Sequence, residues 1–512
     1  MKTFDKKHKL LFIILISLYV LLFLLSLPGR VPHIDDAWLG EHSYWLLHDG
    51  IAKTKLMTNI AHGDERLILH HKLFTLQGAI VIYCCGFSLS ALKSVSFVYL
   101  LLLVGLFFFI HKKNWFAKRE ALSLSLLLLL ANPLTFEFGF VFRPEIMLSF
   151  LGLASAYLIV KPNVSKTTKL HAFISGLIAG LSLATHLNGS IFIAAGSLYL
   201  IIKRKWASAL LFAAGSIVTS LIYFYDFQSF NDFSYWIHQL TFIPSDNNSS
   251  GLFKTFLLSV LDEQRRYFHS PKEIIFTLLI VVSLSFSWKK IKQEQSALLL
   301  YTFLAMMAMS VLALNKTSKY FLMILPFVIL IISHSYYIIL RSKNKNRIRI
   351  FNITLLLYLA ISLVYNVAVV RQKYDPKINA AITAAYAGDK PSEIRILAPM
   401  EFIFNEIGQY ERIVGLMSFN ERLKLDPNLK ADQFLETAKR EHIDLILLPG
   451  YYQEKFQLIH NPPNTLLNGF RLIEKSDQLM VWKLDTASNA LHYTKPRLAY
   501  SKYGMIFRGA FK

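Results

Sequence analysis

The sequence predicts a multi-span α-helical membrane protein of about eleven transmembrane helices, followed by a small extracytoplasmic α/β domain. Of its 512 residues, 54% are hydrophobic and only 17% are charged, whereas soluble chains are about one-quarter charged. Long apolar runs recur through the first 371 residues, and the net charge of +22 is concentrated in the connections between alternate runs. This apolar content excludes a disordered chain, and two adjacent cysteines exclude a disulfide-stapled scaffold.

The first run, Leu10–Leu27, contains no charged residue and follows four lysines, which predicts a membrane-spanning helix that starts in the cytoplasm. A cleaved signal peptide is the alternative, but the run is longer than a typical signal core and no small-residue cleavage site follows it. We expect ten further spans at about 94–110, 119–134, 145–160, 170–185, 188–202, 207–225, 273–288, 296–313, 320–340 and 350–370.

The segment 72–90 is apolar but is interrupted by Gln77, Gly78 and Gly86. We interpret it as an interfacial or re-entrant helix within the first outer loop, residues 28–93. A crossing here would place the later basic clusters on the wrong side of the membrane.

The distribution of charge supports this layout. The inner segments carry 22 Lys and Arg residues and only three acidic residues, whereas the outer segments up to residue 371 are electrically neutral in sum. This asymmetry follows the positive-inside rule. The inner segments are 1–9, 111–120, 161–169, 203–206, 289–295 and 341–349.

Residues 1–371 are therefore predicted to form the transmembrane domain, and residues 372–512 to form the outer domain. In this second part, 393–399 and 442–449 indicate short buried strands, and 430–441 indicates a helix. The segment 470–484 indicates two strands, and the whole pattern predicts a mainly parallel sheet without a phosphate-binding loop.

An acidic pair follows the first span. Apolar and aromatic residues recur at helical spacing between Asp35 and Gly50, which predicts an amphipathic helix at the membrane surface. Asp35 and Asp36 at its start are suited to accept a proton from a hydroxyl group or to hold a divalent cation. Spacing alone favours the simpler interpretation that one Asp caps the helix and the other is solvated.

Three further polar sites lie at the outer ends of predicted spans. Arg143 and Glu145 stand where a helix enters the bilayer, so they form either a salt bridge or part of a functional cavity. His186 breaks two tightly joined spans, and a buried, hydrogen-bonded histidine is its simplest explanation. Lys316 and Lys319 either contact an anion such as a lipid phosphate or extend towards the headgroups.

In combination, these motifs resemble the GT-C membrane glycosyltransferases that use polyprenyl-phosphate sugars, the group of the lipid A aminoarabinose transferase and the protein O-mannosyltransferases. IDDAWLGEHSYWLLHDG (34–50) is similar to the acidic pair and helix of that family, and FRPEIML (142–148) to its Arg-Pro-Asp/Glu element. THLNG (185–189) and KTSKYFLMILP (316–326) are similar to its later motifs, so the resemblance covers about residues 10–340.

One motif departs from the family pattern. Members usually carry a His-Pro-Pro or Glu-Lys-Pro element before the helix that corresponds to 72–90, whereas this chain has Leu69-His70-His71-Lys72-Leu73. Which of His70, His71 and Lys72 faces the donor phosphate stays open.

The resemblance implies an inverting transfer of a sugar from a polyprenyl-phosphate donor to a hydroxyl acceptor at the outer face. Asp35 corresponds to the catalytic carboxylate, with Asp36 as its acidic neighbour. No metal site is predicted, because no ligand set with adequate spacing is visible, although a divalent cation stays open as a cofactor. The donor phosphate is expected to contact Arg143, Lys316, Lys319, Tyr320, His71 and Lys72, with Glu41, Glu145 and His186 in supporting positions.

The implied partners are the lipid-linked donor, a lipid, glycan or protein acceptor and the bilayer, but not nucleic acid. We expect a bacterial inner membrane protein with a cytoplasmic N-terminus and a periplasmic C-terminal domain. The alternatives are a diphosphate-dependent glycan ligase, a polytopic transporter and a non-catalytic assembly protein. A transporter is disfavoured because ionisable residues fall at the outer ends of the spans and no internal repeat is visible.

Overall fold

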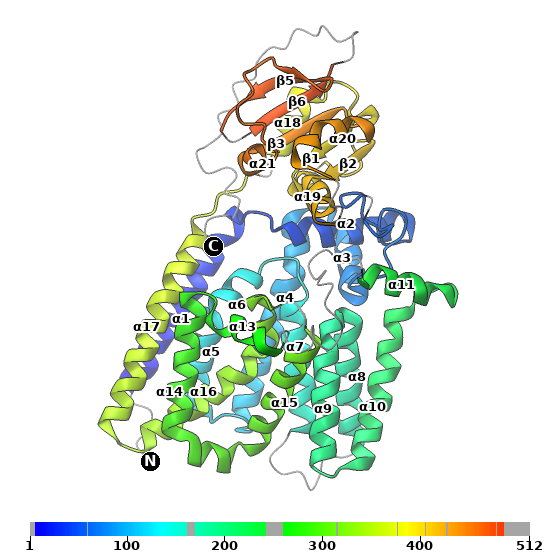
Figure 1. Ribbon diagram of the computed structural model, residues 1–512. Helices are drawn as coiled ribbons and strands as arrows, with labels where there is room; N and C mark the ends of the chain where they lie inside the picture. The colour runs from blue at the N-terminus through cyan, green and yellow to red at the C-terminus, as the bar shows by residue number, and fades with distance from the viewer. Residues whose placement is uncertain are drawn as a thin grey trace.

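A bundle of apolar helices carries an α/β unit at one end (Figure 1). The computed structural model describes residues 6–485 except 59, 161–168, 242–259, 314–315, 376, 405, 426–428 and 478. The predictions for the basic segments at the N-terminus and at 161–168, and for the end of the outer domain after residue 485, lie outside the described residues.

Five helices are long and apolar enough to cross a membrane. They are α1 (Lys6–Ser26), α4 (Leu89–Lys112), α10 (Trp206–Ser220, extended by the 3-10 turn η5, Leu221–Phe224), α14 (Pro271–Glu294) and α17 (Lys345–Val370). Their outward faces are lined by exposed leucines, isoleucines and valines, such as Leu357 and Val364, as expected for side chains that meet lipid.

Shorter apolar helices fill the spaces between these five. They are α5 (Leu122–Ala131), α6 (Pro133–Phe138), α7 (Glu145–Ile159), α8 (Lys169–Thr185), α9 (Ser190–Ile202), α15 (Ser296–Leu312) and α16 (Leu325–Arg341). Most of α16 is buried, so it forms the interior of the bundle. Each predicted span except 119–134 coincides with one main apolar helix, which supports the helical membrane class, while the crossing of all eleven segments stays a prediction.

The predicted span 119–134 is divided into two helices. Asn132 ends α5, and its side-chain oxygen accepts hydrogen bonds from the backbone N–H groups of Leu134 and Thr135, at 3.0 and 3.3 Å. Pro133 then occupies the first position of α6, where its missing N–H is tolerated. A cap followed by proline starts a new helix at this point.

The outer layer consists of α2 (Ile34–Asp49), α3 (Lys72–Cys85), α11 (Asn231–Thr241) and the short α13 (Arg265–Phe268). The 14 residues of α3 span about 21 Å at 1.5 Å per residue, less than the roughly 30 Å apolar core of a bilayer. The predicted helix after the first span is present as α2 and ends at Gly50, whose φ of 70° is left-handed. However, α2 is packed between α3 and the α/β unit instead of lying free on a membrane surface.

The α/β unit contains one six-stranded sheet in the order β2-β1-β3-β6-β5-β4. Its strands are β1 (Arg395–Ala398), β2 (Arg412–Gly415), β3 (Leu445–Pro449), β4 (Leu466–Leu467), β5 (Phe470–Lys475) and β6 (Leu479–Leu484). Its helices are α18 (Ile378–Tyr386), α19 (Leu416–Leu425), α20 (Phe434–Arg440) and α21 (Gly450–Lys455). The predicted strands and the helix at 430–441 occur as β1, β3, β5, β6 and α20.

The sheet is mixed, not mainly parallel as the sequence suggested. β1 pairs in parallel with β2 and β3, whereas β6 is antiparallel to both β3 and β5. The short connection between β5 and β6 explains their antiparallel pairing, because strands joined by a tight turn pair in this way. The antiparallel pairing of β6 with β3 joins segments that are distant in the chain.

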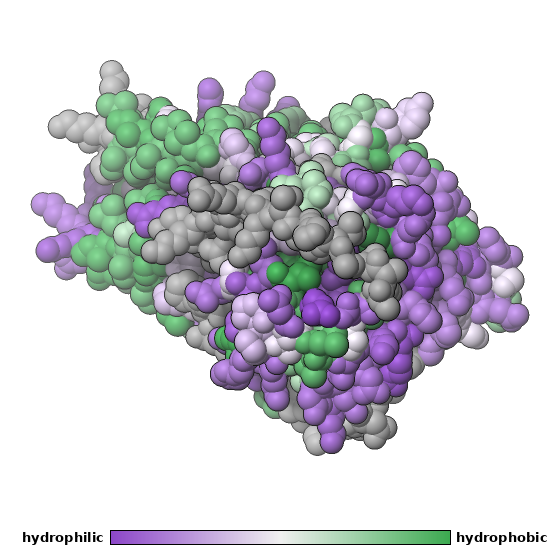
Figure 2. Space-filling view, turned by 90° about the horizontal axis from the view of Figure 1, so that it is seen from above, coloured by the Kyte–Doolittle hydropathy of each residue, from purple (hydrophilic) through white to green (hydrophobic). Residues whose placement is uncertain are grey.

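The α/β unit sits on one end of the bundle above α2 (Figure 1). Gly415 N–H donates to Leu56 O at 2.9 Å, and one continuous apolar core contains residues of α2, α3 and the sheet. From above, hydrophilic side chains cover much of this end, while hydrophobic ones form a band along one side (Figure 2). The fold thus places α2 and the ends of several apolar helices beneath a polar cap.

Candidate functional site

Asp35 lies in the first turn of α2, at the outer end of the bundle. Its side chain is 17% exposed and pairs with the guanidinium of Arg143. His33 Nδ1 lies 3.0 Å from Asp35 Oδ2 and also accepts the backbone N–H of Asp35 at 3.1 Å. Asp35 is therefore a carboxylate with one strong cationic partner and with access to a reactant.

Asp36 has a different environment from its neighbour. Its carboxylate is fully buried and accepts the backbone N–H groups of His33 at 2.7 Å and Phe142 at 2.5 Å. Lys93 Nζ lies 3.4 Å from the same carboxylate. The helix cap is His33, and Asp36 completes a capping box from the N3 position, so the expected Asp cap is replaced by a His–Asp pair. These contacts fix the start of α2 against the turn before α7.

Arg143 connects Asp35 to Glu145. Its Nε donates to both carboxylate oxygens of Glu145 at 3.1 and 3.0 Å, while one terminal nitrogen faces Asp35. Tyr320 also accepts a hydrogen bond from this guanidinium. Arg143 is 4% exposed and Glu145 is completely buried, so the Arg-Pro-Glu element forms an ion pair oriented towards Asp35.

Lys319 and two histidines complete this group. The rings of His71 and His186 lie 4.3 Å apart, and the ring of His186 lies 6.0 Å from that of Tyr320. Within the part of the chain that the structure describes, the Lys319 ammonium makes no hydrogen bond or ion pair. We call Asp35, Arg143, Glu145, Lys319, Tyr320, His71 and His186 the Arg143 cluster.

Burial controls the charge of this cluster. Burial and the nearby Arg143 guanidinium lower the pKa of Lys319 to about 8. Burial lowers the pKa of His71 to about 4 and holds the pKa of His186 well below its usual value. At neutral pH the histidines are uncharged, and Lys319 makes no close ion pair among the described residues, although the Glu145 carboxylate acts on it from a longer distance.

Lys72 is directed away from this cluster. Its ammonium lies 2.7 and 2.6 Å from the two carboxylate oxygens of Asp226, and His70 Nε2 lies 3.2 Å from one of them. The rings of Tyr223, Tyr225 and Phe227 surround the same ammonium at 5.4 to 5.8 Å. We call Lys72, Asp226 and His70 the Lys72 cluster. Of the three candidates that the sequence left open, His71 is therefore the one that joins Arg143.

Lys316 and Glu41 also make local contacts. Lys316 pairs with Glu263 at 3.0 Å and donates to the carbonyls of Ser310 and Ala313 at 2.7 and 3.1 Å, where it caps the end of α15. Glu41 accepts hydrogen bonds from Thr54 Oγ1 at 2.7 Å and from the backbone N–H of residue 55 at 2.7 Å. Both side chains hold nearby backbone in place.

Sequence reasoning missed Lys93, Asp226 and Glu263, which balance charges of the predicted residues. Lys93 stands directly before the apolar run 94–110, and Asp226 and Glu263 stand in a long outer segment without a recognisable spacing. Of the three, only Lys93 could have been noticed in the sequence, because a lysine beside a long apolar run needs an acidic partner.

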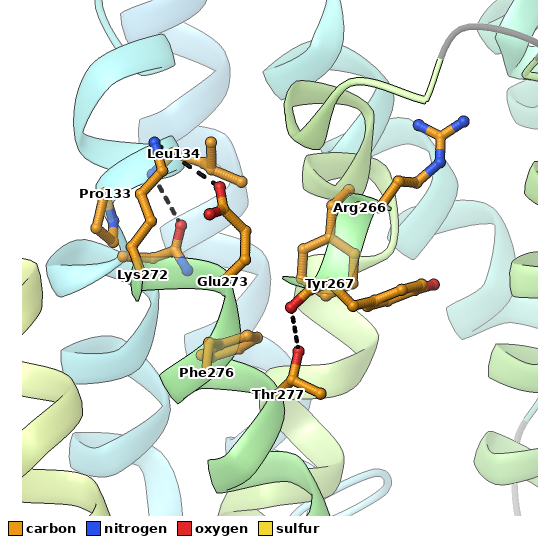
Figure 3. Close-up of a pocket in the computed structure, with 10 residues that line it drawn as sticks. Pro133, Leu134, Arg266, Tyr267, Lys272, Glu273, Phe276 and Thr277 are labelled. Carbon is orange, nitrogen blue, oxygen red and sulfur yellow. Dashed lines mark hydrogen bonds and ion pairs between the residues drawn. The ribbon is translucent and has the colours of Figure 1, made fainter. Parts of the chain in front are cut away.

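No group of three or more possible metal ligands occurs among the described residues, so their arrangement supplies no metal centre. A small pocket lies beside the 3-10 turn η8 (Ser318–Met323), which contributes Phe321 to its lining (Figure 3). Lys272 and Glu273 approach each other at one wall, 3.8 Å apart, whereas Arg266 points away from them. The pocket is lined by Asn132, Pro133, Leu134, Arg266, Tyr267, Lys272, Glu273, Phe276, Thr277 and Phe321.

No family model and no curated protein matches the chain by sequence. Solved structures do match it by fold. ArnT from Cupriavidus metallidurans bound to undecaprenyl phosphate has a TM-score of 0.57 at 12% identity, covering 93% of this chain and 98% of that chain. The same ArnT in the apo state has a TM-score of 0.61 at 12% identity, with the same coverage.

The apo oligosaccharyltransferase of Archaeoglobus fulgidus has a TM-score of 0.51 at 10% identity, covering 88% of this chain and 71% of that chain. These likenesses show that the chain shares the fold of these solved structures, in agreement with the fold that the sequence motifs predict. Together with the apolar helices, they show that the chain is a membrane-embedded protein.

Proposed function

We propose that the protein is an inverting glycosyltransferase that moves a sugar from a polyprenyl-phosphate donor to a hydroxyl acceptor. The proposal places the reaction at the outer, periplasmic face of a bacterial inner membrane. One observation carries the proposal: the partly exposed carboxylate of Asp35 faces Arg143, beside a Lys319 ammonium that makes no close ion pair among the described residues.

The cations account for the donor phosphate. Arg143 and Lys319 are close enough for their charges to lower the pKa of Lys319, and a phosphate between them would relieve that repulsion. Fixed cations in a site with little water stabilise the negative charge that grows on a leaving phosphate. Tyr320 at the Arg143 guanidinium adds a hydroxyl that can donate to a phosphate oxygen.

Asp35 supplies the base. When a phosphate engages Arg143, the ion pair that now restrains Asp35 is weakened, and its carboxylate becomes free to accept a proton. The acceptor hydroxyl then attacks the anomeric carbon from the side opposite the phosphate, which inverts the configuration. Asp36 does not take part, because backbone N–H groups and Lys93 already occupy its oxygens.

The fold comparison supports the class of donor, because the ArnT structure with the same fold was solved with undecaprenyl phosphate bound. The positive-inside asymmetry supports the direction, since it places α2 and the Arg143 cluster on the outer side. The polar cap of the α/β unit above α2 is consistent with an aqueous face at this end.

A transfer assay tests the proposal. Membranes that contain the wild-type protein or the Asp35→Asn variant are incubated with labelled polyprenyl-phosphate sugars and envelope acceptors, and labelled product is counted. We expect Asp35→Asn to reduce turnover by at least about a thousandfold at equal protein level, since it removes the base but keeps the shape.

Asp36→Asn is the matched control. It is expected to lower the amount of folded protein but to retain turnover per folded molecule, because Asp36 holds the start of α2. Normal turnover in Asp35→Asn would refute the mechanism. Transfer from a polyprenyl-diphosphate sugar but not from a monophosphate would instead identify a glycan ligase.

A further inference from the structure

Four side chains beside the Arg143 cluster carry buried hydrogen-bonding atoms without a partner. Among the described residues, no hydrogen bond reaches either ring nitrogen of His42, Trp38 Nε1, His70 Nδ1 or Thr75 Oγ1. His42, His70 and Thr75 are each at most 2% exposed. Buried polar groups are almost always paired with protein, ordered water or a ligand, so these atoms mark a place that receives a hydrogen-bonding partner.

On α2, the unpartnered atoms share the face of the proposed base. Asp35 and His42 are seven residues apart, which is close to two helical turns and about 10 Å along the axis. Trp38 lies between them, and its ring centre is 5.1 Å from that of His42. A group that reaches Asp35 from this side therefore meets Trp38 and then His42.

The other two atoms belong to Thr75 on α3 and to His70, which stands two residues before α3 begins. α2 and α3 pack closely where Ser43 meets Gly78, since a Cβ at Gly78 would stand 2.3 Å from Ser43 Oγ. Thr75 lies one turn before Gly78, on the same side of α3. Burial, with the nearby His70 and His71, holds the pKa of His42 well below its usual value. His42 and His70 therefore lie close together, and Thr75 lies on the side of α3 that packs against α2.

We propose that these four residues form a glycosyl subsite that binds a neutral, hydroxyl-rich sugar ring next to Asp35. The proposal deepens the proposed function, on which it rests, by naming the class of sugar. Sugar hydroxyls both donate and accept hydrogen bonds, which matches an uncharged imidazole, an alcohol and an indole N–H.

The surrounding charges favour a neutral sugar over an acidic or an amino sugar. The charged groups closest to His70 are Lys72 and Asp226. These two residues form an ion pair with an N–O distance of 2.6 Å and neutralise each other. Apart from the Asp35 carboxylate, which is reserved for the acceptor proton, the subsite therefore presents no uncompensated charge within the described residues. A charged sugar placed here would lose its hydration without gaining an ion pair.

Binding measurements on the purified full-length protein in lipid nanodiscs test the subsite. The donor arm compares polyprenyl phosphate with polyprenyl-phosphate glucose, mannose, aminoarabinose and galacturonate. The acceptor arm measures neutral methyl hexosides by ligand-observed NMR with polyprenyl phosphate present. The variants are Thr75→Val and His42→Phe, which keep side-chain volume, and the control is the exposed His48→Phe on the same helix.

We expect the neutral sugars to bind best in wild type. Each variant should weaken sugar binding in one arm by about five- to tenfold, the effect of losing one or two hydrogen bonds. Bare polyprenyl phosphate should bind all proteins equally, and His48→Phe should behave as wild type. The arm that responds identifies whether the donor sugar or an acceptor sugar occupies the subsite.

Several results would overturn the proposal. Unchanged sugar affinity in both variants, with a gain in thermal stability, would show that only water satisfies these atoms. Tighter binding of aminoarabinose or galacturonate than of the hexoses would refute the neutral class. If polyprenyl phosphate does not bind wild type at all, the proposed function fails, and the methyl hexoside arm still decides whether a sugar subsite exists.

Discussion

The Arg143 cluster and the Lys72 cluster lie at the two sides of the start of α3, yet they differ in how completely their charges are satisfied. In the Lys72 cluster, one ammonium is held by both oxygens of Asp226 and enclosed by three aromatic rings. In the Arg143 cluster, Lys319 has no such partner among the described residues, and Asp35 stays partly exposed. Charges with a full set of partners stabilise a fold, whereas a charge that lacks one is available to a ligand.

The largest effect is expected in the Lys72 cluster. Asp226→Asn removes the counter-charge of a lysine whose side chain is fully buried, and it should lower the free energy of unfolding by about 3 kcal/mol. The double variant with Lys72→Met should recover most of this loss, because no unpaired charge is left. Unfolding in detergent, followed by circular dichroism, measures both.

If Asp226→Asn abolishes sugar transfer but leaves the free energy of unfolding unchanged, the Lys72 cluster serves catalysis and does not stabilise the fold. Gln239→Ala is a suitable control on the same outer segment, since it removes neutral hydrogen bonds to residues 68 and 69 without exposing a charge.

The second effect concerns the two lysines of the late outer turn. Lys319→Met should reduce transfer by about a hundredfold, since it removes a charge that stabilises the leaving phosphate. Lys316→Met should reduce transfer less than about fivefold, because that ammonium caps α15 and pairs with Glu263. Single-turnover rates at saturating donor measure the comparison.

Equal losses in the two variants would contradict the distinction between a partnered and an unpartnered lysine. Lys319→Arg is the informative third variant, because it keeps the charge and changes only its shape. It should retain more transfer than Lys319→Met.

Periodicity and charge in the sequence were enough to predict the helical class, the position of each apolar helix and four strands of the sheet. They could not predict the mixed pairing of the sheet, because the pairing of β3 with β6 joins segments that are distant in the chain. The break of α5 at Asn132 was also missed, although the Asn-Pro sequence is a known helix start.

For the candidate site, the sequence proposed Asp35, Arg143 and Lys319, which the fold brings together, while their roles stay a prediction. It could not separate Lys319 from Lys316 or His71 from Lys72, since all four are basic or polar residues at the outer ends of helices. The difference comes from Glu263 and Asp226, which are distant in sequence and meet these lysines only after folding.

A third prediction follows from the pKa of Lys319, which burial and Arg143 lower to about 8. The ammonium is needed in its charged form, so donor affinity should be constant below pH 8 and fall about tenfold for each pH unit above it. Lys319→Arg should remove this decline, because guanidinium stays charged throughout the range. Donor binding between pH 6 and 10 provides the measurement, and a decline that persists in the arginine variant would exclude Lys319 as its source.

The smallest effect is expected at the ion pair between Arg412 of the sheet and Asp64 of the outer loop, where the N–O distance is 3.0 Å. The Arg412 and Asp64 side chains pair with each other but remain 31% and 23% exposed. Water therefore screens their charges, and the coupling free energy between them should be at most about 1 kcal/mol. By contrast, Phe402 is 2% exposed in the apolar core shared with α2, and Phe402→Ala should cost about 3 kcal/mol. A double-mutant cycle of Arg412→Ala and Asp64→Ala, with Phe402→Ala alongside, measures both values by unfolding. A coupling free energy above about 2 kcal/mol would mean that this ion pair, and not apolar burial alone, holds the outer domain on α2. It would also mean that an exposed ion pair can stabilise the fold as strongly as a buried one.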